Sequence, residues 1–156
     1  MVHVLFVCLG NICRSPMAEA MFRDLVKREG LDRKISIDSA GTGDWHVGHP
    51  PHLGTRQLLD QRGISYEGMQ ARQLSVDDFE NFDYIIGMDA SNINNIQSIE
   101  PKQSKARVIR LLDLASDQLV KDVPDPYYTG NFDEVAELVA SGCQALLELI
   151  KMEHSL

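Results

Sequence analysis

The segment from Cys8 to Ser15, which reads Cys-Leu-Gly-Asn-Ile-Cys-Arg-Ser, constrains this chain more than any other. An apolar run at residues 2–7 precedes it and predicts a buried strand, and a helical pattern follows it from Pro16. A strand, a tight loop and a helix in this order direct several backbone N–H groups at one point, where an anion can bind. The segment therefore predicts an anion-binding loop at the end of the first strand.

The residue types of this loop suit attack by a thiolate on a phosphoryl group. A cysteine at a helix N-terminus beside a cation has a pKa of roughly 3.5–7.5 instead of about 8.5, and Cys8 is placed for that effect. Arg14 offers a planar fork of donors that matches two phosphoryl oxygens. We expect Ser15 to cap the helix, with a hydroxyl that can also bond the Cys8 sulfur. Reading Cys8 and Cys13 as inert buried cysteines leaves Arg14 unexplained.

The whole segment fits a Cys-x5-Arg-Ser signature and resembles the low molecular weight protein tyrosine phosphatase family, as a bacterial-type member. Three later segments resemble family segments in the expected order, namely DSAGTGDWHVG at 38–48, FDYIIGMD at 82–89 and DVPDPYY at 122–128. The resemblance runs through nearly the whole chain. It implies a cysteine-dependent protein tyrosine phosphatase that needs no metal and no cofactor, hydrolyses phosphotyrosine and aryl phosphates, and has inorganic phosphate as product and inhibitor.

The resemblance also assigns the catalytic residues as Cys8, Arg14 and Asp125. Asp125 lies between two prolines that stiffen its loop, and it matches the family's general acid. A positioned carboxylic acid typically contributes about 10²–10⁴-fold to such a reaction. Asp122 is the nearest competitor, but it lies outside the matching Asp-Pro-Tyr-Tyr segment. The local sequence alone also permits Asp125 to be a simple turn former.

The phosphate loop is expected to bind phosphate through its whole length after the nucleophile: Leu9, Gly10, Asn11, Ile12, Cys13, Arg14 and Ser15. By the resemblance, Asn11, Ser15 and Ser39 support the loop, with Ser39 bonded to Asn11. Many family members carry a histidine, bonded to this asparagine, where the present chain has Met69. A thioether cannot donate a hydrogen bond, so the support should depend more on Ser39 and the backbone.

Aromatic residues are expected to wall the substrate cleft. By the resemblance these are Trp45, Tyr127 and Tyr128, and a deep aromatic slot suits an aryl phosphate. Ile12 is also expected to line this cleft. Related arginine phosphatases carry a threonine at the position of Ile12, where it can bond a guanidinium. An isoleucine cannot, so phosphotyrosine is favoured and phosphoarginine is the alternative.

The three cysteines, Cys8, Cys13 and Cys143, are too few and too scattered for a disulfide framework. Cys13 lies in the same bent loop as Cys8, and we predict that it forms a reversible disulfide with the nucleophile. A thioredoxin-coupled arsenate reductase would need two further redox cysteines downstream of the loop. The chain has none between Cys13 and Cys143, so that activity ranks low.

Two other readings are weighed against the phosphatase. A zinc site could use His46, His49 and His52 with the loop cysteines, but Arg14 would lie beside the cation, so we expect no metal and read the histidines as solvated. A non-catalytic phosphate-binding module would have no use for both Cys8 and Asp125.

Composition sets the remaining bounds. With 156 residues, 44% of them hydrophobic, the chain is long enough for one domain over 1–156. A net charge of −8 opposes binding to nucleic acid and to anionic membranes. Because no signal peptide or apolar membrane segment is recognisable, we expect a cytoplasmic protein, a monomer or weak homodimer, whose partners are tyrosine-phosphorylated proteins.

The order of the patterns predicts an α/β fold. Strands are expected at 2–7, 35–39, 83–88 and 106–111. Helices are expected at 16–29 and 51–63, from 89 to about 101, and from 131 onward, with a further helix start at 75–78. Strands separated by helices indicate one three-layer domain, a twisted, parallel four-stranded sheet with helices on both faces. The phosphate loop would lie after the first strand, at the carboxyl edge of the sheet, where such folds bind ligands.

Overall fold

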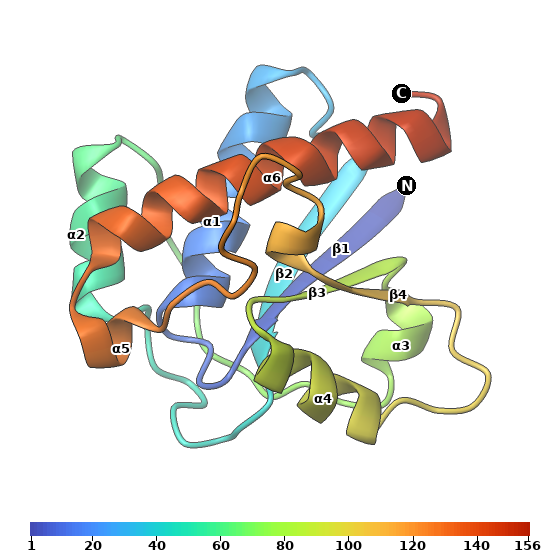
Figure 1. Ribbon diagram of the computed structural model, residues 1–156, viewed down its shortest axis with the longest axis horizontal. Helices are drawn as coiled ribbons and strands as arrows, with labels where there is room; N and C mark the ends of the chain where they lie inside the picture. Colours follow the sequence, from blue (N-terminus) through green and yellow to red (C-terminus); the bar gives the residue numbers. More distant parts are fainter.

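The computed structural model describes residues 1–156 and contains one parallel four-stranded sheet (Figure 1). Its strand order is β2-β1-β3-β4, so the first strand lies inside the sheet. The prediction of a parallel four-stranded sheet is confirmed, although the second strand is longer than expected and the last two are shorter. The strands are β1 (Val2–Cys8), β2 (Ile35–Gly41), β3 (Tyr84–Gly87) and β4 (Arg107–Arg110).

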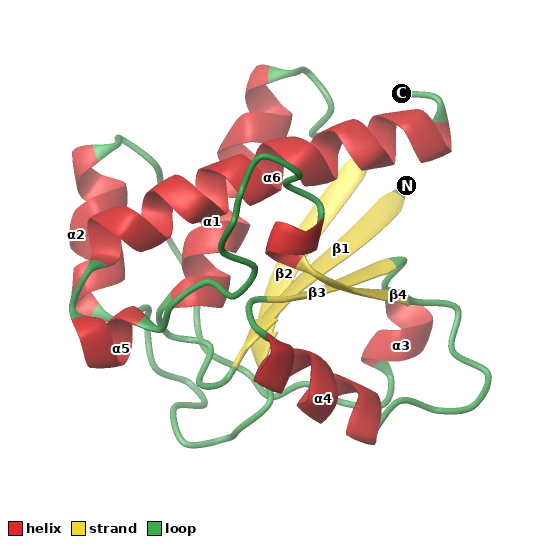
Figure 2. Cartoon of the chain, viewed as in Figure 1, coloured by secondary structure: helices red, strands yellow, loops and turns green.

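Helices follow each strand and cover both faces of the sheet (Figure 2). The expected long helices are present, and two short ones, α5 and the 3₁₀ turn η1, lie in segments where the sequence pattern gave no helix. The helices are α1 (Arg14–Arg28), α2 (Leu53–Gln61), α3 (Asp78–Asn81), α4 (Ala90–Ser98), η1 (Leu111–Asp113), α5 (Pro126–Thr129) and α6 (Phe132–His154).

The start of α1 corrects one expectation. The helix begins at Arg14, with Cys13 in the N-cap position and no side-chain hydrogen bond at the cap. Ser15 is therefore a residue of the first turn and not the cap. Its hydroxyl lies between Cys8 and Asn11, so it is engaged by the loop and is not available to the helix end.

Strand β1 divides the core into two layers because its side chains alternate between the faces of the sheet. Val4 and Phe6 pack in a large apolar cluster with residues of α1 and α6, whereas Leu5 and Val7 pack in a second cluster with residues of α3 and α4. A strand covered on both faces is apolar where it is covered, which is why residues 4–7 are all hydrophobic, whereas His3 near the start of the strand is only partly buried. The three-layer α/β arrangement is confirmed.

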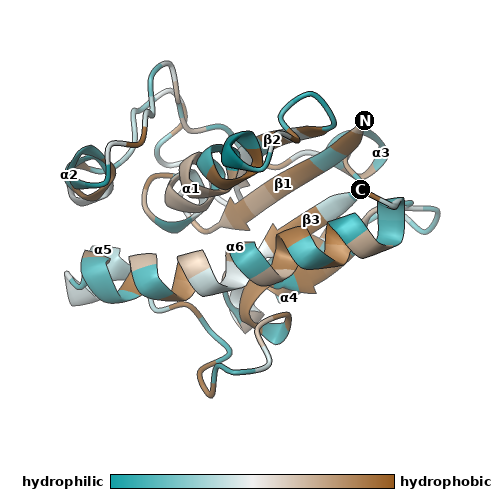
Figure 3. Ribbon diagram, turned by 90° about the horizontal axis from the view of Figure 1, so that it is seen from above, coloured by the Kyte–Doolittle hydropathy of each residue, from teal (hydrophilic) through white to brown (hydrophobic).

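Helix α6 is amphipathic, and it lies across α1 with an apolar face inward (Figure 3). Cys143 belongs to this buried face, and burial raises the pKa of its thiol, so it remains a small apolar packing residue. Gly142 lies so close to Leu111 of η1 that a side chain would not fit there. None of the helices combines the length and the hydrophobicity that a membrane-spanning helix requires.

One glycine at the end of β2 determines how closely the phosphate loop can approach the sheet. A Cβ atom on Gly41 would lie 2.9 Å from the Leu9 carbonyl oxygen and 3.1 Å from the Asn11 nitrogen. The backbone of the loop therefore packs directly on the backbone of β2. This contact places the loop at the carboxyl edge of the sheet.

Candidate active site

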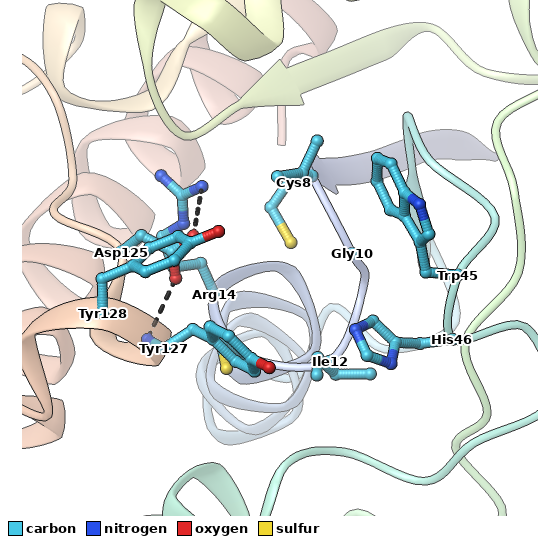
Figure 4. Close-up of a pocket in the computed structure, with 11 residues that line it drawn as sticks. Cys8, Gly10, Ile12, Arg14, Trp45, His46, Asp125, Tyr127 and Tyr128 are labelled. Carbon is cyan, nitrogen blue, oxygen red and sulfur yellow. Dashed lines mark hydrogen bonds and ion pairs between the residues drawn. The ribbon is translucent and has the colours of Figure 1, made fainter.

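The phosphate loop forms the floor of a cavity of about 190 Å³ (Figure 4). Three segments that are far apart in the sequence meet there: the loop after β1, the loop after β2 and the start of α5. The Cys8 sulfur points into the space between Trp45 on one side and the two tyrosines on the other (Figure 4). The lining residues are Cys8, Leu9, Gly10, Ile12, Cys13, Arg14, Trp45, His46, Asp125, Tyr127 and Tyr128.

The backbone of the phosphate loop is held by its carbonyl groups. Leu9 O accepts from Gly43 N at 2.9 Å, and Ile12 O accepts from His52 N at 2.7 Å. Asn11 adopts a left-handed conformation with φ of 56°, which turns the chain at the centre of the loop.

The N–H groups of the same loop are free. None of the backbone N–H groups from Leu9 to Ser15 donates to another group of the chain. Buried N–H groups in proteins almost always have a partner. A row of unpartnered donors at the end of a strand and the start of a helix is therefore a site built for an anion.

Arg14 is buried beneath the cavity and is held by fixed partners. Its Nη1 donates to Asp89 Oδ2 at 2.7 Å and to the Val123 carbonyl at 2.9 Å, and its Nη2 lies 3.5 Å from Asp125 Oδ2. Burial alone would lower the pKa of this guanidinium, but Cys8, Asp89 and Asp125 together hold the pKa above its ordinary value. Its Nε is buried and has no partner in the chain, so one donor remains for an anion.

Asp125 is the N-cap of α5, and its side chain has two neighbours. Oδ1 accepts from Tyr127 N at 3.1 Å, and Oδ2 faces Arg14 (Figure 4). The short helix, with Pro126 at its first position, holds the carboxyl group at the mouth of the cavity. Asp122, the alternative acid, bonds Ala90 N and Arg110 instead and does not line the cavity.

Cys8 is connected to Ser15, Asn11 and Ser39 by a series of hydrogen bonds. Cys8 Sγ lies 3.0 Å from Ser15 Oγ, and Asn11 Nδ2 donates to Ser15 Oγ at 2.7 Å and to Ser39 Oγ at 3.0 Å. Asn11 Oδ1 accepts from the Arg72 backbone N–H at 3.0 Å. The side chains of Asn11 and Ser15 thus lie beneath the loop and not in the cavity. The expected Ser39–Asn11 bond is present in the structure.

The aromatic rim of the cavity, Trp45, Tyr127 and Tyr128, is exposed. The exposed fractions are 66% for Trp45, 53% for Tyr127 and 76% for Tyr128, against 8% for Ile12 on the wall. The two tyrosine rings pack edge to face with their centroids 5.3 Å apart. Large aromatic side chains exposed together at the mouth of a cavity favour the binding of a flat, apolar group.

His46 corrects the reading of the three loop histidines. It lines the cavity beside Trp45 and lies against Gly10, so it is not simply solvated. His52 also has a structural role, because its ring accepts from Gly54 N at the start of α2 and stacks on Phe132. His49 is exposed, as expected.

Cys13 lines the cavity with Cys8, and both are free thiols. Burial, with the charges of Cys8 and Asp125 adding to it, raises the pKa of the Cys13 thiol to about 12. Its backbone oxygen is fixed by the hydroxyl of the buried Thr55 at 3.1 Å.

Sequence reasoning missed two acidic residues that hold this site. Asp89, the partner of Arg14, lies two residues beyond the end of β3, at the carboxyl edge of the sheet. That position is the signal that could have identified it. Glu19 accepts from Ser39 Oγ at 2.6 Å and is buried in α1. A carboxylate between Ala18 and Ala20 on the apolar side of a helix was the available signal.

Comparison with known proteins identifies the family of this chain. A family model described as low molecular weight phosphotyrosine protein phosphatase matches residues 3–156. The chain belongs to that family. The low molecular weight protein-tyrosine-phosphatase YfkJ of Bacillus subtilis is 56% identical over 156 residues, which is 100% of each chain. Its crystal structure superposes with a TM-score of 0.95, covering 98% of this chain and 96% of that one.

A more distant member of the same fold has a different substrate in its description. The structure described as DARP, drosophila arginine phosphatase, is 33% identical, with a TM-score of 0.89 over 95% of this chain and 97% of that chain. The low molecular weight phosphatases are cysteine-dependent phosphatases. The present family member is therefore an enzyme of this kind that acts on phosphorylated proteins.

Proposed function

We propose that this phosphatase hydrolyses phosphotyrosine through a phosphorylated Cys8, with Arg14 binding the phosphoryl group and Asp125 as general acid and base. The observation that carries the proposal is the row of free N–H groups from Leu9 to Ser15, in the loop that directly follows Cys8. The partnerless Arg14 Nε supplies a charged donor in the same place. Donors fixed in advance around a phosphoryl group are the largest electrostatic contribution available to such a site.

The first step transfers the phosphoryl group to sulfur. The Cys8 thiolate attacks phosphorus while Arg14 and the loop N–H groups bind the phosphoryl oxygens, and the bond from phosphorus to the tyrosine oxygen breaks. Asp125 gives its proton to the departing oxygen, so the leaving group is a neutral phenol. The second step reverses these roles. Asp125 takes a proton from water, the water oxygen attacks phosphorus, and inorganic phosphate leaves as the thiolate is restored.

The depth of the cavity and its rim favour an aryl ester. Cys8 and Arg14 are buried, whereas Tyr127 and Tyr128 are exposed at the mouth, so a substrate must extend from the floor past the rim. A phosphotyrosine ring is long and flat enough to do so and to contact the aromatic side chains on its way. Ile12 on the wall presents only carbon atoms, which offer no hydrogen bond to the guanidinium of phosphoarginine.

The substrate assignment can be tested with matched peptides. The purified chain should release phosphate from a phosphotyrosine peptide at least about tenfold faster, in kcat/KM, than from the same peptide carrying phosphoarginine. Ile12→Thr should narrow that ratio, because it adds a hydroxyl at the wall of the cavity. Ile12→Val is the matched control and should leave the ratio unchanged. A parent enzyme that prefers phosphoarginine would contradict the assignment.

Cys13 is proposed as the redox partner of the nucleophile. Both cysteines line one small cavity, so oxidation of Cys8 to a sulfenic acid can be followed by attack of the Cys13 thiol, which forms a disulfide and releases water before further oxygen is added. A working thiolate of this kind suits a reducing compartment such as the cytoplasm, and the enzyme is proposed to act there as a monomer or weak homodimer. Activity should return after peroxide and then reductant in the parent. Activity should return far less in Cys13→Ser. Equal recovery of activity in the parent and in this variant would show that Cys13 does not protect Cys8.

A further inference from the structure

Beneath the phosphate loop, a buried carboxylate ends the series of hydrogen bonds that begins at the nucleophile. Glu19 is 6% exposed, and its Oε1 accepts from Ser39 Oγ at 2.6 Å. Its Oε2 pairs with Arg23 one helical turn later. Arg23 in turn donates to the Ile37 carbonyl at 3.1 Å, which ties this pair to β2. Glu19 does not line the active-site cavity, so it has no direct contact with a substrate there.

The side chain of Met69 lies near Ser39 but offers it no hydrogen bond. Met69 lines a small cavity together with Asn11 and Ser39. A thioether has no hydrogen to donate, so it cannot orient either neighbour. Glu19 is the charged group that contacts the Ser39 hydroxyl, whereas Asp38 Oδ1 accepts from the Ser39 backbone N–H at 2.8 Å. Asp38 and Glu67 line the groove outside Glu19, and Asp38 is paired with Arg72.

The direction of each hydrogen bond follows from the chemistry of its two ends. A carboxylate only accepts, so the Ser39 hydroxyl must give its hydrogen to Glu19 and must accept from Asn11. Asn11 Oδ1 already accepts from the Arg72 N–H, which fixes its amide nitrogen toward the two serines. Both amide hydrogens are then used, one on Ser39 and one on Ser15.

Ser15 completes the series at the nucleophile. Because its oxygen accepts from Asn11, its own hydrogen is left to donate. Two acceptors are within reach, the Cys8 sulfur at 3.0 Å and the Ala40 carbonyl at 3.5 Å. The sulfur is the nearer of the two, and hydrogen bonds to a charged acceptor are about twice as strong as those to a neutral one.

We propose that Glu19 is a positioning residue that fixes the direction of this whole series, so that Ser15 donates its hydrogen to the Cys8 thiolate. The inference rests on the proposed function of Cys8 as the nucleophile. It adds that the reactivity of the sulfur depends on a charge that is separated from it by three side chains, those of Ser39, Asn11 and Ser15. A glutamine in place of Glu19 can donate to Ser39 as well as accept from it, so the direction would no longer be imposed.

The test compares Glu19→Gln with the parent by the pH dependence of iodoacetate alkylation at Cys8. Loss of a hydrogen bond to a charged group should move the midpoint of that profile up by about one pH unit. The kcat for p-nitrophenyl phosphate near neutral pH should fall about tenfold, with KM nearly unchanged. Asp24→Asn is the matched control, because it removes the same charge from an exposed pair on the same helix and should change neither readout.

Ser39→Ala is the second variant, and it keeps the proposal testable if Glu19→Gln folds poorly. It should shift the alkylation midpoint in the same direction, and Glu19→Gln should add nothing further in the Ser39→Ala background. Two independent shifts that add would overturn the proposal, as would a Glu19→Gln profile that matches the parent. Alkylation needs no turnover, so an inactive parent would refute the proposed function and still leave this test decisive.

Discussion

The floor of the cavity and its rim differ in how far their side chains are buried and in how many partners hold them. In the phosphate loop, Cys8 and Arg14 are only 3% and 2% exposed, and each contacts partners within the chain. At the rim, Trp45 and Tyr128 are 66% and 76% exposed. The floor has many internal hydrogen bonds that fix its atoms, and the rim has large surfaces that contact little of the chain itself.

This difference separates chemistry from recognition. A group that stabilises a transition state must be held in place before the substrate arrives, which is what the buried partners of the floor achieve. A group that recognises a substrate gains by exposing apolar area that the ligand will cover. Changes at the floor should therefore lower turnover of every phosphate ester, whereas changes at the rim should affect only aryl substrates.

The variant with the largest expected effect on the floor of the cavity is Arg14→Lys. Lysine keeps the charge but loses the planar fork and the Nε donor that the floor leaves free, so kcat should fall about 10²–10³-fold. The loss should be similar for a phosphotyrosine peptide and for a small alkyl phosphate, measured by phosphate release. Arg28→Lys, on the exposed side of the same helix, should have no effect. Full activity in Arg14→Lys would show that charge alone suffices.

Asp125→Asn should have the next largest effect, and that effect should depend on the leaving group. Without a proton donor, kcat for phosphotyrosine should fall about 10²–10⁴-fold. The fall should be smaller for p-nitrophenyl phosphate, whose phenolate leaves without help. Asp122→Asn is the matched control, because Asp122 lies in the same segment but bonds Arg110. Equal losses on both substrates in Asp125→Asn would argue against a role in protonation.

The rim should give smaller and more selective effects. Trp45→Ala and Tyr128→Ala should each lower kcat/KM for a phosphotyrosine peptide about 2–10-fold, because each removes one aromatic contact. Glycerol phosphate, which cannot reach the rim, should be hydrolysed at the parent's rate. Val47→Ala serves as the control in the same loop, since Val47 is also exposed but does not line the cavity. A uniform loss on all substrates would mean that the rim supports the floor.

The smallest effect concerns stability at high pH. The folded state raises the pKa of Cys13 from 9.0 to about 12, so it holds the thiol proton more tightly than the unfolded chain. The associated stability is complete below pH 9.0 and is lost as the pH rises toward about 12. The midpoint of urea unfolding should therefore fall less between pH 8.5 and 11 in Cys13→Ala than in the parent. Identical slopes would show that Cys13 ionises equally in both states.

The sequence was enough to predict most of the fold. Alternating apolar strands and helices predicted the parallel sheet, and the Cys-x5-Arg-Ser segment predicted the loop at its edge, both of which the structure contains. The ends of elements were less predictable. Helix α1 begins at Arg14, before the expected start, because the phosphate loop and not a serine cap determines where the helix begins.

The supporting acids were harder to predict because their roles exist only in three dimensions. Asp89 is 75 residues away in sequence from Arg14, the residue it holds. Glu19 lies on a helix face whose other residues are apolar, and it holds Ser39 in the next strand. Their partners Arg14 and Ser39 were identified, but nothing in the sequence pairs an acid with either. His46 was read as solvated for the same reason, since only the folded loop brings it to Gly10.

The central claim is that the buried Cys8 sulfur carries the phosphoryl group during turnover. The most direct test is rapid acid quench of the enzyme with a ³²P-labelled phosphotyrosine peptide, followed by location of the label in the chain. The account predicts label on Cys8 within the first turnover, formed and lost at rates consistent with kcat, and none in Cys8→Ser. Steady release of phosphate with no label ever present on Cys8 would contradict it.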